Sequence, residues 1–591
     1  MSIEVLSAKE LKYINKFFIK YRYKLLVGIL ITIIARIFSL VVPPYVKKSL
    51  ETVEKYLESP NDVPLIEGQL TEYILIIIGA AILSGFFTFL MRQTIINVSR
   101  YIEFDLKNEI FRQYEKLSLN FYKQNRTGDL MNRISEDVSQ VRMYAGPAIM
   151  YSIQTITLFV CVIPLMFYSS SSMAIYTLLP LPVLSFLIYK ISRIIHKRST
   201  VVQEYLSKLS TFSQESFSGI SVIKAYGIEP RINQELELLA NEGKDKSMDL
   251  VRVNAWFMPL MALMIGISTL FVIWIGGRQY IKGEIESVAV IAEFIIYVNY
   301  LTWPVATVGW VTSIVKRAEA SQERINEFLG QTPEIQNTVQ KNTPVNGKIE
   351  FRNVTFTYED TEITALKNLS FIAEQGKTTA IIGRTGSGKS TILNLTGRLY
   401  DVTEGTILVD DVPVKKLNLY SLRNAIGAVP QDAFLFSDTI ENNIKFGKEN
   451  ASHDEIVTVA KKAAVHDNIE NFANKYQTVL GERGITLSGG QKQRISIARA
   501  LIKDPQIYLF DDCLSAVDTE TEEEILNNLQ NATVSKTTLI VSHRISTVKN
   551  ADHIIVIEDG KVVKQGTHNQ LISEEGYYKE LYLNQLSEKE L

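Results

Sequence analysis

The sequence predicts an all-α membrane domain of six transmembrane helices followed by a cytosolic α/β domain of the P-loop type. Two observations lead to this prediction. Long runs almost without charge recur through the first half of the chain, and a glycine-rich loop stands between an apolar strand and a helix in the second half. Apolar runs of about 20 residues can cross a bilayer as helices, and a glycine-rich loop at a strand–helix junction is typical of phosphate binding.

Length and charge narrow the range of functions. The chain has 591 residues, more than one hydrophobic core accommodates, so several domains are expected. The net charge is −2, so the overall charge gives no indication of a nucleic acid partner. The two cysteines, Cys161 and Cys513, lie far apart and form no disulfide or metal-binding pattern.

Apolar stretches predict six spans within a membrane domain of residues 25–315. A buried soluble helix could explain one such stretch, but it is a poor explanation for six in series. One stretch is long enough for two spans with a turn at Ser169–Ser172. The stretches are Leu25–Val46, Tyr73–Met91, Met143–Tyr189, Val253–Gly277 and Ser287–Val315.

The distribution of lysine and arginine predicts the orientation of these spans. Basic residues are concentrated in residues 1–24, 92–142 and 190–252, whereas the first connection, 51–72, is mostly acidic. Basic loops stay on the cytoplasmic side of a membrane. We therefore expect a multi-pass protein of the inner (plasma) membrane, with both termini in the cytoplasm and an interfacial helix over residues 1–24.

The two long basic segments, 92–142 and 190–252, are predicted to be helical extensions of the spans into the cytosol. Their apolar residues recur at spacings of three and four. Each contains a turn-like piece, Phe121–Asp129 and Gly219–Gly227. Such pieces could be solvated hairpins, but a nucleotide domain on the same chain favours docking contacts with a cytosolic domain.

After a linker over residues 316–347, residues 348–591 are predicted to form a nucleotide-binding domain that uses ATP and Mg²⁺. The loop fits the pattern G-x-x-x-x-G-K-[ST], in which backbone amides and a lysine hold phosphates and a hydroxyl ligates Mg²⁺. Tyr358 ends a strand, where it could stack on adenine or simply pack. The loop residues expected to hold ATP are Gly383, Arg384, Thr385, Gly386, Ser387, Gly388, Lys389, Ser390 and Thr391.

Four further motifs follow the loop in a fixed order. Gln431 follows Val429-Pro430, and Leu487-Ser488-Gly489-Gly490-Gln491 leads into a helix. An apolar strand then ends in Asp511, whose carboxylate would hold Mg²⁺, and another apolar strand delivers His543 at its carboxyl end. Open α/β sheets bind their ligands at that end of their strands.

The order of these motifs resembles that of the ATP-binding cassette (ABC) family, and six spans ahead of one cassette resemble the half-transporter of an ABC exporter. The resemblance implies that Tyr358 is the adenine-binding aromatic residue and that Gln431 and His543 serve hydrolysis, with Ser390, Gln431 and Asp511 around Mg²⁺. It also implies a dimer, in which Ser488, Gly489, Gly490 and Gln491 contact the ATP held by the other subunit. Three further resemblances are the D-loop Ser515–Asp518, an X-loop Thr478–Gly484 whose Glu482 would join in coupling, and intracellular loops at Phe121–Arg133 and Gly219–Gly227.

Asp512 departs from the family pattern, in which a glutamate follows the aspartate of the Walker B strand, here Asp511, and serves as the catalytic base or positions the attacking water. Aspartate is shorter by one methylene, which withdraws the carboxylate by about 1.5 Å. A misplacement of about 1 Å can cost ~10²-fold in rate, so we expect this site to bind ATP and hydrolyse it slowly. A shifted backbone or an extra water could instead let Asp512 serve as the base.

The chain thus combines an altered Walker B sequence, Asp511-Asp512, with an intact signature sequence, Leu487–Gln491. In the family this combination is the pattern of one half of a heterodimeric exporter, so we expect a second half-transporter as partner, although a homodimer stays open. The predicted function is ATP-driven export of an amphipathic or hydrophobic substrate (a drug, lipid or peptide) across the cytoplasmic membrane. The alternative is a non-pumping ABC protein, a regulator or an ATP-gated channel. Arg36 and Glu293 are the charges inside the apolar runs. Because lipid exposure is costly, such groups usually face a cavity, a partner or an interface. Our hypothesis is that both line the central cavity, although Glu293, about two turns inside its span, could instead lie at the outer surface.

Overall fold

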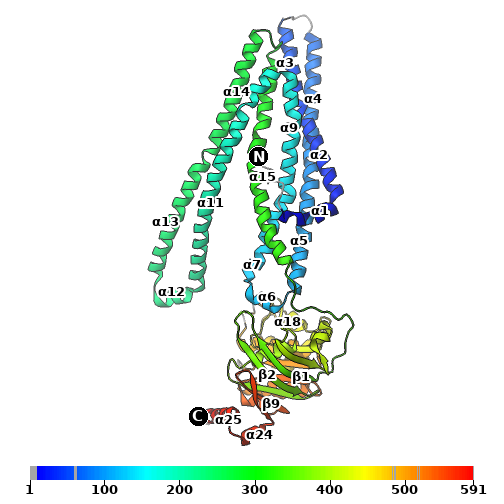
Figure 1. Ribbon diagram of the computed structural model, residues 1–591, viewed down its shortest axis with the longest axis vertical. Coiled ribbons are helices and arrows are strands. Elements are labelled where there is room, and N and C mark those ends of the chain that lie inside the picture. Colours follow the sequence, from blue (N-terminus) through cyan, green and yellow to red (C-terminus); the bar gives the residue numbers. More distant parts are fainter. Residues whose placement is uncertain are drawn as a thin grey trace. The chain divides into compact units, whose positions relative to one another are not determined.

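The computed structural model describes residues 9–58, 63–481, 484, 487–514, 517 and 519–589, and the chain divides into two compact units (Figure 1). The first unit comprises Met1–Gln113 and Gly128–Gly330, and the second comprises Tyr114–Thr127 and Gln331–Leu591. The short segment Tyr114–Thr127 therefore belongs to the second unit, although the sequence places it within the membrane domain.

The described part of the first unit is helical, and six helical stretches in it are long and apolar enough to cross a membrane, as predicted. The third and fourth stretches are separated at Ser170, within the predicted serine turn. The helices are η2 Glu10–Ile14, α1 Asn15–Lys20, α2 Arg22–Leu40, α3 Val42–Glu58, α4 Val63–Met91, η3 Arg92–Ile96, α5 Asn97–Lys116, α7 Thr127–Asn132, η4 Arg133–Asp137, α8 Val138–Met143, η5 Tyr144–Ala148, α9 Ile149–Ser169, α10 Ser171–Leu178, α11 Pro180–Ser218, α12 Ile220–Tyr226, α13 Glu229–Asn254, α14 Phe257–Ile281 and α15 Ala289–Leu329.

The long basic segments are helical extensions of the spans, as predicted. Helix α11 runs without a break from Pro180 to Ser218, and α13 returns from Glu229 to Asn254, with the short helix α12 between them. The pair α11 and α13 lies side by side in Figure 1. On α12, Ile220, Val222 and Tyr226 are exposed, which leaves an apolar surface at the tip of this hairpin.

The N-terminal segment packs on the helices of its own unit. Ile14 is fully buried. Lys16 Nζ donates to Glu109 at 2.6 Å, and Lys20 Nζ donates to Asp105 at 2.5 Å, both acids lying on α5. The apolar face of the segment and two of its cations are thus engaged by protein.

The predicted linker begins later than expected. Residues 316–329 continue α15, because Ala318, Ile325 and Phe328 recur at helical spacing and are buried. The charged residues between them hide this periodicity in the sequence. The change from one unit to the other falls between Gly330 and Gln331.

The second unit is built on two sheets. An antiparallel sheet has the strand order β2-β1-β4-β5, and a six-stranded sheet has the order β10-β9-β3-β8-β7-β6, with parallel pairing from β9 to β6. The strands are β1 Ile349–Thr357, β2 Thr364–Ala373, β3 Thr378–Gly383, β4 Glu404–Val409, β5 Val412–Pro413, β6 Ile426–Val429, β7 Ile507–Asp511, β8 Thr537–Val541, β9 His553–Glu558 and β10 Lys561–Gly566.

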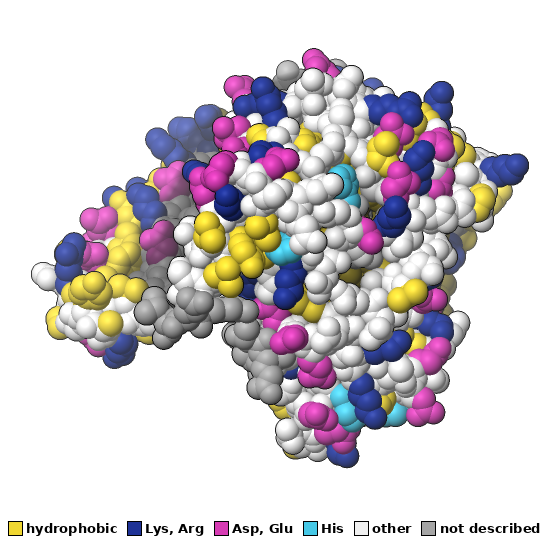
Figure 2. Space-filling model, turned by 90° about the horizontal axis from the view of Figure 1, so that it is seen from below, with side chains coloured by type: hydrophobic (Ala, Val, Ile, Leu, Met, Phe, Trp, Pro, Cys, Tyr) yellow, Lys and Arg dark blue, Asp and Glu magenta, His cyan; other side chains and the backbone are white. Residues whose placement is uncertain are grey.

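Helices cover these sheets and complete the α/β domain. Three apolar clusters pack against the sheets: one around β1, β2 and β3, one around α18, α19 and α21, and one between β3, β9 and the helices α23–α25. The helices are α6 Leu119–Gln124, α16 Lys389–Thr396, η6 Val414–Lys416, α17 Leu419–Asn424, α18 Ile440–Lys445, α19 His453–Lys462, α20 His466–Glu470, η7 Lys475–Gln477, α21 Gly489–Ile502, α22 Thr519–Ala532, α23 Ile545–Val548, α24 His568–Ser573 and α25 Tyr577–Lys589. Over the face shown in Figure 2, basic and acidic side chains are interspersed.

Candidate active site

Four of the predicted motifs meet at one edge of the parallel sheet. In the pairing registers, Ile381 of β3 and Asp511 of β7 are both partners of Val541 of β8, and Val429 of β6 is the partner of Phe510. The residues that follow these strands therefore emerge together, which is where parallel α/β sheets bind ligands. The phosphate loop, Asp512, His543 and Gln431 all lie just beyond these strand ends.

The phosphate loop requires its glycines. A Cβ on Gly383 would lie 2.2 Å from the carbonyl oxygen of Ile557, and one on Gly388, whose φ is +98°, would lie 2.4 Å from that of Ala365. The Ser387 hydroxyl oxygen is buried and has no hydrogen-bond partner within the described structure. A buried hydroxyl without a partner is costly, so this loop is suited to a ligand that supplies phosphate oxygens.

Lys389 begins α16 at the base of the loop. Its side chain is buried, and Nζ donates to the carbonyl oxygens of Gly383 at 2.9 Å and Arg384 at 2.8 Å. Burial lowers the pKa of Lys389, while the carboxylates of Asp512 and Asp511 act in the opposite direction. The ammonium is thus held within the loop by carbonyl oxygens that a bound phosphate would supplement.

Ser390 and Asp511 meet as the sequence predicts for a Mg²⁺ site. Ser390 Oγ donates to Asp511 Oδ1 at 3.0 Å. Burial raises the pKa of Asp511, and the hydrogen bond from Ser390 opposes this shift. A hydroxyl and a carboxylate are hard oxygen donors that suit Mg²⁺, so these two residues fit the metal.

Gln431 is exposed after β6. Its carbonyl oxygen accepts a hydrogen bond from Gln493 Nε2 at 3.3 Å, which links it to α21. Among the described contacts, none joins the Gln431 side chain to Ser390 or Asp511. The structure brings Gln431 to the same sheet edge, and a role as metal ligand stays a prediction.

Asp512 has a constrained backbone. Its φ is +45°, in the left-handed region, and its N–H donates to the carbonyl oxygen of Val541 at 2.8 Å. Aspartate is among the few residues other than glycine that adopt this region readily. The following residue, Cys513, is buried, so the main chain that carries the Asp512 carboxylate is held on both sides.

His543 follows β8 beside the same carboxylates. Burial lowers the pKa of His543, and the charge of Lys389 acts in the same direction. The imidazole is therefore neutral near pH 7 and can both donate and accept a hydrogen bond. The carbonyl oxygen of His543 accepts from Gln585 Nε2 at 2.9 Å, which ties the site to α25.

The signature residues open α21 as predicted. Ser488 is the N-cap, and a capping box joins it to Gln491: Ser488 Oγ accepts from Gln491 N at 3.3 Å, and Gln491 Oε1 accepts from Ser488 N at 3.0 Å. Ser488 and Gly489 are exposed. An exposed helix N-terminus of this length is suited to an anion presented by another molecule.

Tyr358 is half-buried and packed among other side chains. Its hydroxyl lies 3.0 Å from Thr391 Oγ1 on α16, and its ring makes edge contacts with Phe356 and Tyr400 at centroid distances of 4.8 and 5.6 Å. The sequence pointed to Tyr358 but not to Tyr400. Tyr400 carries no motif, and only the fold brings it beside the strand end.

Part of the predicted coupling segment is attached to the cassette unit. Ser118 Oγ donates to Glu334 at 2.8 Å, and Asn120 Nδ2 donates to Glu334 at 2.9 Å and to Glu359 at 3.0 Å. These two residues directly precede the first turn-like piece, Phe121–Asp129, and within that piece Lys123 Nζ lies 4.1 Å from the centroid of the Tyr358 ring. The predictions for Glu482, Ser515, Ala516 and Asp518 lie outside the described residues.

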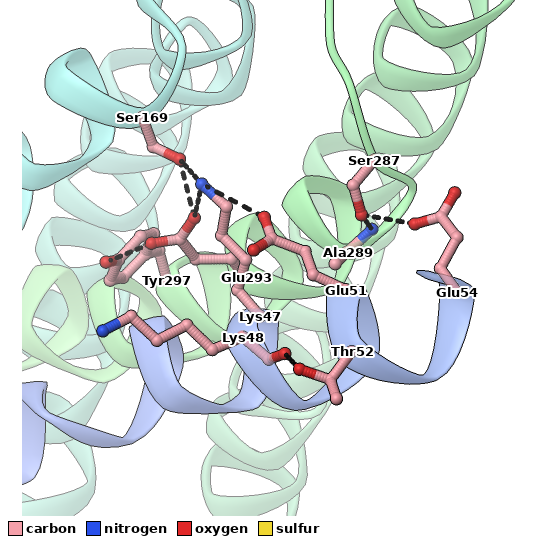
Figure 3. Close-up of polar contacts among 10 residues, drawn as sticks. All are labelled: Lys47, Lys48, Glu51, Thr52, Glu54, Ser169, Ser287, Ala289, Glu293 and Tyr297. Carbon is pink, nitrogen blue, oxygen red and sulfur yellow. Dashed lines mark hydrogen bonds and ion pairs between the residues drawn. The ribbon is translucent and has the colours of Figure 1, made fainter. Parts of the chain in front are cut away.

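The structure assigns Glu293 a place other than the one predicted. Its side chain is 5% exposed, and it accepts from Ser169 Oγ at 2.6 Å and Tyr297 OH at 2.9 Å, with Lys47 Nζ at 3.5 Å (Figure 3). The prediction that Glu293 lines an open cavity is therefore wrong, because a cation and two hydroxyls from the same chain enclose the carboxylate. Arg36 is half-buried and donates to Gln154 Oε1 at 2.9 Å.

A six-span helical unit and a P-loop α/β unit on one chain define the class of the protein as a membrane-embedded nucleotide-driven transporter. Models of two families match the chain: "ABC transporter transmembrane region" over residues 25–305 and "ABC transporter" over residues 366–515. The chain belongs to the ABC transporter family, and it is an ATP-dependent exporter of the half-transporter type.

Individual relatives and a solved structure agree with this assignment. The chain is 35% identical to the multidrug resistance-like ATP-binding protein MdlA of Escherichia coli (strain K12), over 89% of each chain. It is 34% identical to the ATP-dependent lipid A-core flippase of Syntrophus aciditrophicus (strain SB), over 83% of this chain and 82% of that protein. A bacterial Atm1-family ABC exporter with ATP bound superposes with a TM-score of 0.79 at 26% identity, covering 95% of this chain and 98% of the other.

Proposed function

We propose that this chain exports an amphipathic or hydrophobic substrate, a drug, lipid or peptide, by alternating access as one half of a dimer. The observation that carries the proposal is that the six-span unit and the two separate ATP-binding elements, the phosphate loop and the exposed start of α21, occur on one chain. Similarity to a multidrug resistance-like protein and a lipid A-core flippase supports this substrate class.

ATP would lie between two cassettes. Gly383–Thr391 would hold its phosphates, with the unpartnered Ser387 hydroxyl and the Lys389 ammonium among the donors. Ser488, Gly489 and Gly490 would contact the γ-phosphate held by the other subunit, because the N-terminus of α21, where Ser488 and Gly489 are exposed, attracts an anion. The site is thus complete only in the dimer.

In hydrolysis, Ser390 and Asp511 would hold Mg²⁺, which neutralises phosphate charge when bound. Asp512 would orient or deprotonate the attacking water, and His543, neutral near pH 7, would donate to the γ-phosphate region. Gln431, at the end of β6, would complete the surroundings of the metal. Lys389, which keeps two of its three N–H groups on loop carbonyls, would add a phosphate oxygen to these contacts.

We further propose that the site built on Asp512 turns over slowly, and that the chain pairs with a second half-transporter carrying glutamate at this position. The fixed Asp512 backbone supports this, because it leaves the shorter side chain little means of compensation. A homodimer with two slow sites is the competing assembly. Co-purification of the tagged chain from its source would recover a distinct half-transporter in the first case and itself alone in the second.

Transport separates this proposal from the non-pumping alternative. In inverted membrane vesicles the cassette would face the medium, since we place both termini in the cytoplasm and the protein in the inner membrane. ATP-dependent accumulation of a fluorescent lipid or dye, lost in Lys389→Ala, is the expected result. ATP-dependent ion conductance without accumulation would instead establish a gated channel.

A further inference from the structure

The ammonium of Lys123, on helix α6, lies over the ring of Tyr358. Its Nζ is 4.1 Å from the centroid of the Tyr358 ring and 5.2 Å from that of Tyr400. A lysine within about 6 Å of an aromatic centroid is attracted by the electron density of the ring face. All three residues belong to the same compact unit.

Helix α6 is anchored next to Tyr358 by other contacts. Asn120, one turn before Lys123, donates to Glu359, the residue directly after Tyr358, at 3.0 Å, and to Glu334 at 2.9 Å. Asn120 is 7% exposed. The backbone that carries Lys123 is therefore held next to the ring.

Three kinds of contact fix the Tyr358 ring. The hydroxyl bonds to Thr391, the ring edge packs against Phe356 and Tyr400, and Lys123 covers a face. Of these groups, only Lys123 lies on the short segment Tyr114–Thr127. Along the chain this segment joins α5, which ends at Lys116, to α7, which begins at Thr127, and both helices continue into the other unit. Lys123 therefore lies on the stretch of chain between those two helices and contacts the residue proposed to stack on adenine.

We propose that Lys123 is a positioning residue for the adenine base: its ammonium holds the Tyr358 ring ready for stacking. The inference rests on the proposed role of Tyr358 as adenine platform. A ring already ordered loses less side-chain freedom when a base stacks on it, which raises affinity. A baseless phosphate chain gains nothing from this ordering.

The test compares ATP with tripolyphosphate on the purified full-length chain in nanodiscs, with binding followed by isothermal calorimetry. Lys123→Met is expected to raise the Kd for ATP about two- to fivefold, which corresponds to ~0.5–1 kcal/mol at 1.4 kcal/mol per tenfold. Its Kd for tripolyphosphate should stay unchanged. In turnover assays, KM for ATP should rise while kcat at saturation stays within error.

Two further variants serve as controls. Lys123→Arg should restore ATP affinity, because a guanidinium also lies well over an aromatic face. Lys116→Met, at an exposed lysine of the same segment, should leave both affinities unchanged. In a Tyr358→Leu background, Lys123→Met should have no further effect, since the ring on which it acts is gone.

Different outcomes refute different parts of the reasoning. Equal weakening of ATP and tripolyphosphate binding in Lys123→Met, unchanged ATP binding, or tighter ATP binding would each overturn the positioning role. Unchanged ATP affinity in Tyr358→Leu would overturn the adenine platform itself, and with it the proposed function of this residue. If Tyr358→Leu weakens ATP binding and Lys123→Met has no effect, Tyr358 keeps its proposed role as adenine platform and only the proposed role of Lys123 is refuted.

Discussion

Replacing Asp512 by glutamate is the most informative perturbation of this protein. The backbone at this position is held by its left-handed φ of +45°, by the 2.8 Å hydrogen bond to Val541 and by the buried neighbour Cys513. The added methylene would therefore advance the carboxylate by about 1.5 Å rather than displace the main chain.

The expected gain follows from that distance. A misplacement of about 1 Å in a catalytic group can cost ~10²-fold, so Asp512→Glu should raise the kcat for ATP by about 10- to 100-fold. Glutamate adopts the left-handed region less readily than aspartate, at a stability cost of at most about 1–2 kcal/mol. The Kd for ATP should change little, because Asp512 follows the metal-binding strand end and lies outside the phosphate loop.

The assay is steady-state and single-turnover ATP hydrolysis by the purified full-length chain, with Lys389→Ala as background. Asp512→Asn should lower the already slow rate of the native chain only a few-fold, because a carboxylate that stops short of the attacking water contributes little as a base. The reasoning fails if Asp512→Glu is no faster than the native chain. It fails equally if the native chain hydrolyses ATP briskly and Asp512→Asn abolishes that activity, since Asp512 would then be a competent base.

Three further predictions concern stability. Removing the buried acid in Glu522→Ala should destabilise the cassette by about 1–3 kcal/mol in thermal unfolding, because Arg544, Ser546 and Thr547 lose their common acceptor; an unchanged midpoint would show that water replaces the carboxylate. Lys47→Met and Glu293→Gln should each lower the free energy of unfolding in lipid. The loss in the double variant should be smaller than the sum of the two single losses by at least about 0.5 kcal/mol, because both single variants break the same ion pair. Strict additivity would mean that the two residues are not coupled. Burial lowers the pKa of His568, and the charge of Lys549 lowers it further, so the folded state favours the neutral imidazole. The contribution of His568 to the free energy of unfolding is therefore fully present above about pH 6.5 and falls as the pH drops below that value. The protection of α24 amides against hydrogen exchange, taken relative to the intrinsic exchange rate at each pH, should therefore fall at pH 5.5, and His568→Gln should remove that fall. An unchanged fall in the variant would assign it to another group.

The sequence predicted those parts of the fold that depend on local patterns. Apolar length gave the six spans, and the motif order predicted the strand–loop–helix at Gly383 and the helix that begins after Ser488. The prediction for Glu293 failed because hydropathy places a residue along a span but does not identify its neighbours. Lys47 and Ser169, which enclose it, lie more than 120 positions away in the sequence.

The same limit applies within the cassette. Tyr358 stands in a recognisable position, but Lys123 and Tyr400 carry no motif and reach it only through the fold. The end of α15 was missed for a different reason. Its last turns are rich in charge, and the three buried apolar residues in them, Ala318, Ile325 and Phe328, are too sparse to raise the mean hydropathy.

The segment Tyr114–Thr127 changes how coupling between the two units is understood. Because it belongs to the second unit, the chain passes between the units at three places: after Gln113, after Thr127 and after Gly330. Any displacement of one unit relative to the other must therefore be transmitted through three covalent connections, whatever happens to non-covalent contacts. The segment between the first two connections is held by Ser118 and Asn120 through side-chain bonds rather than by a backbone ladder. Those bonds can break singly while the chain stays connected, so Asn120→Ala should reduce the stimulation of ATP hydrolysis by substrate more than it reduces basal hydrolysis.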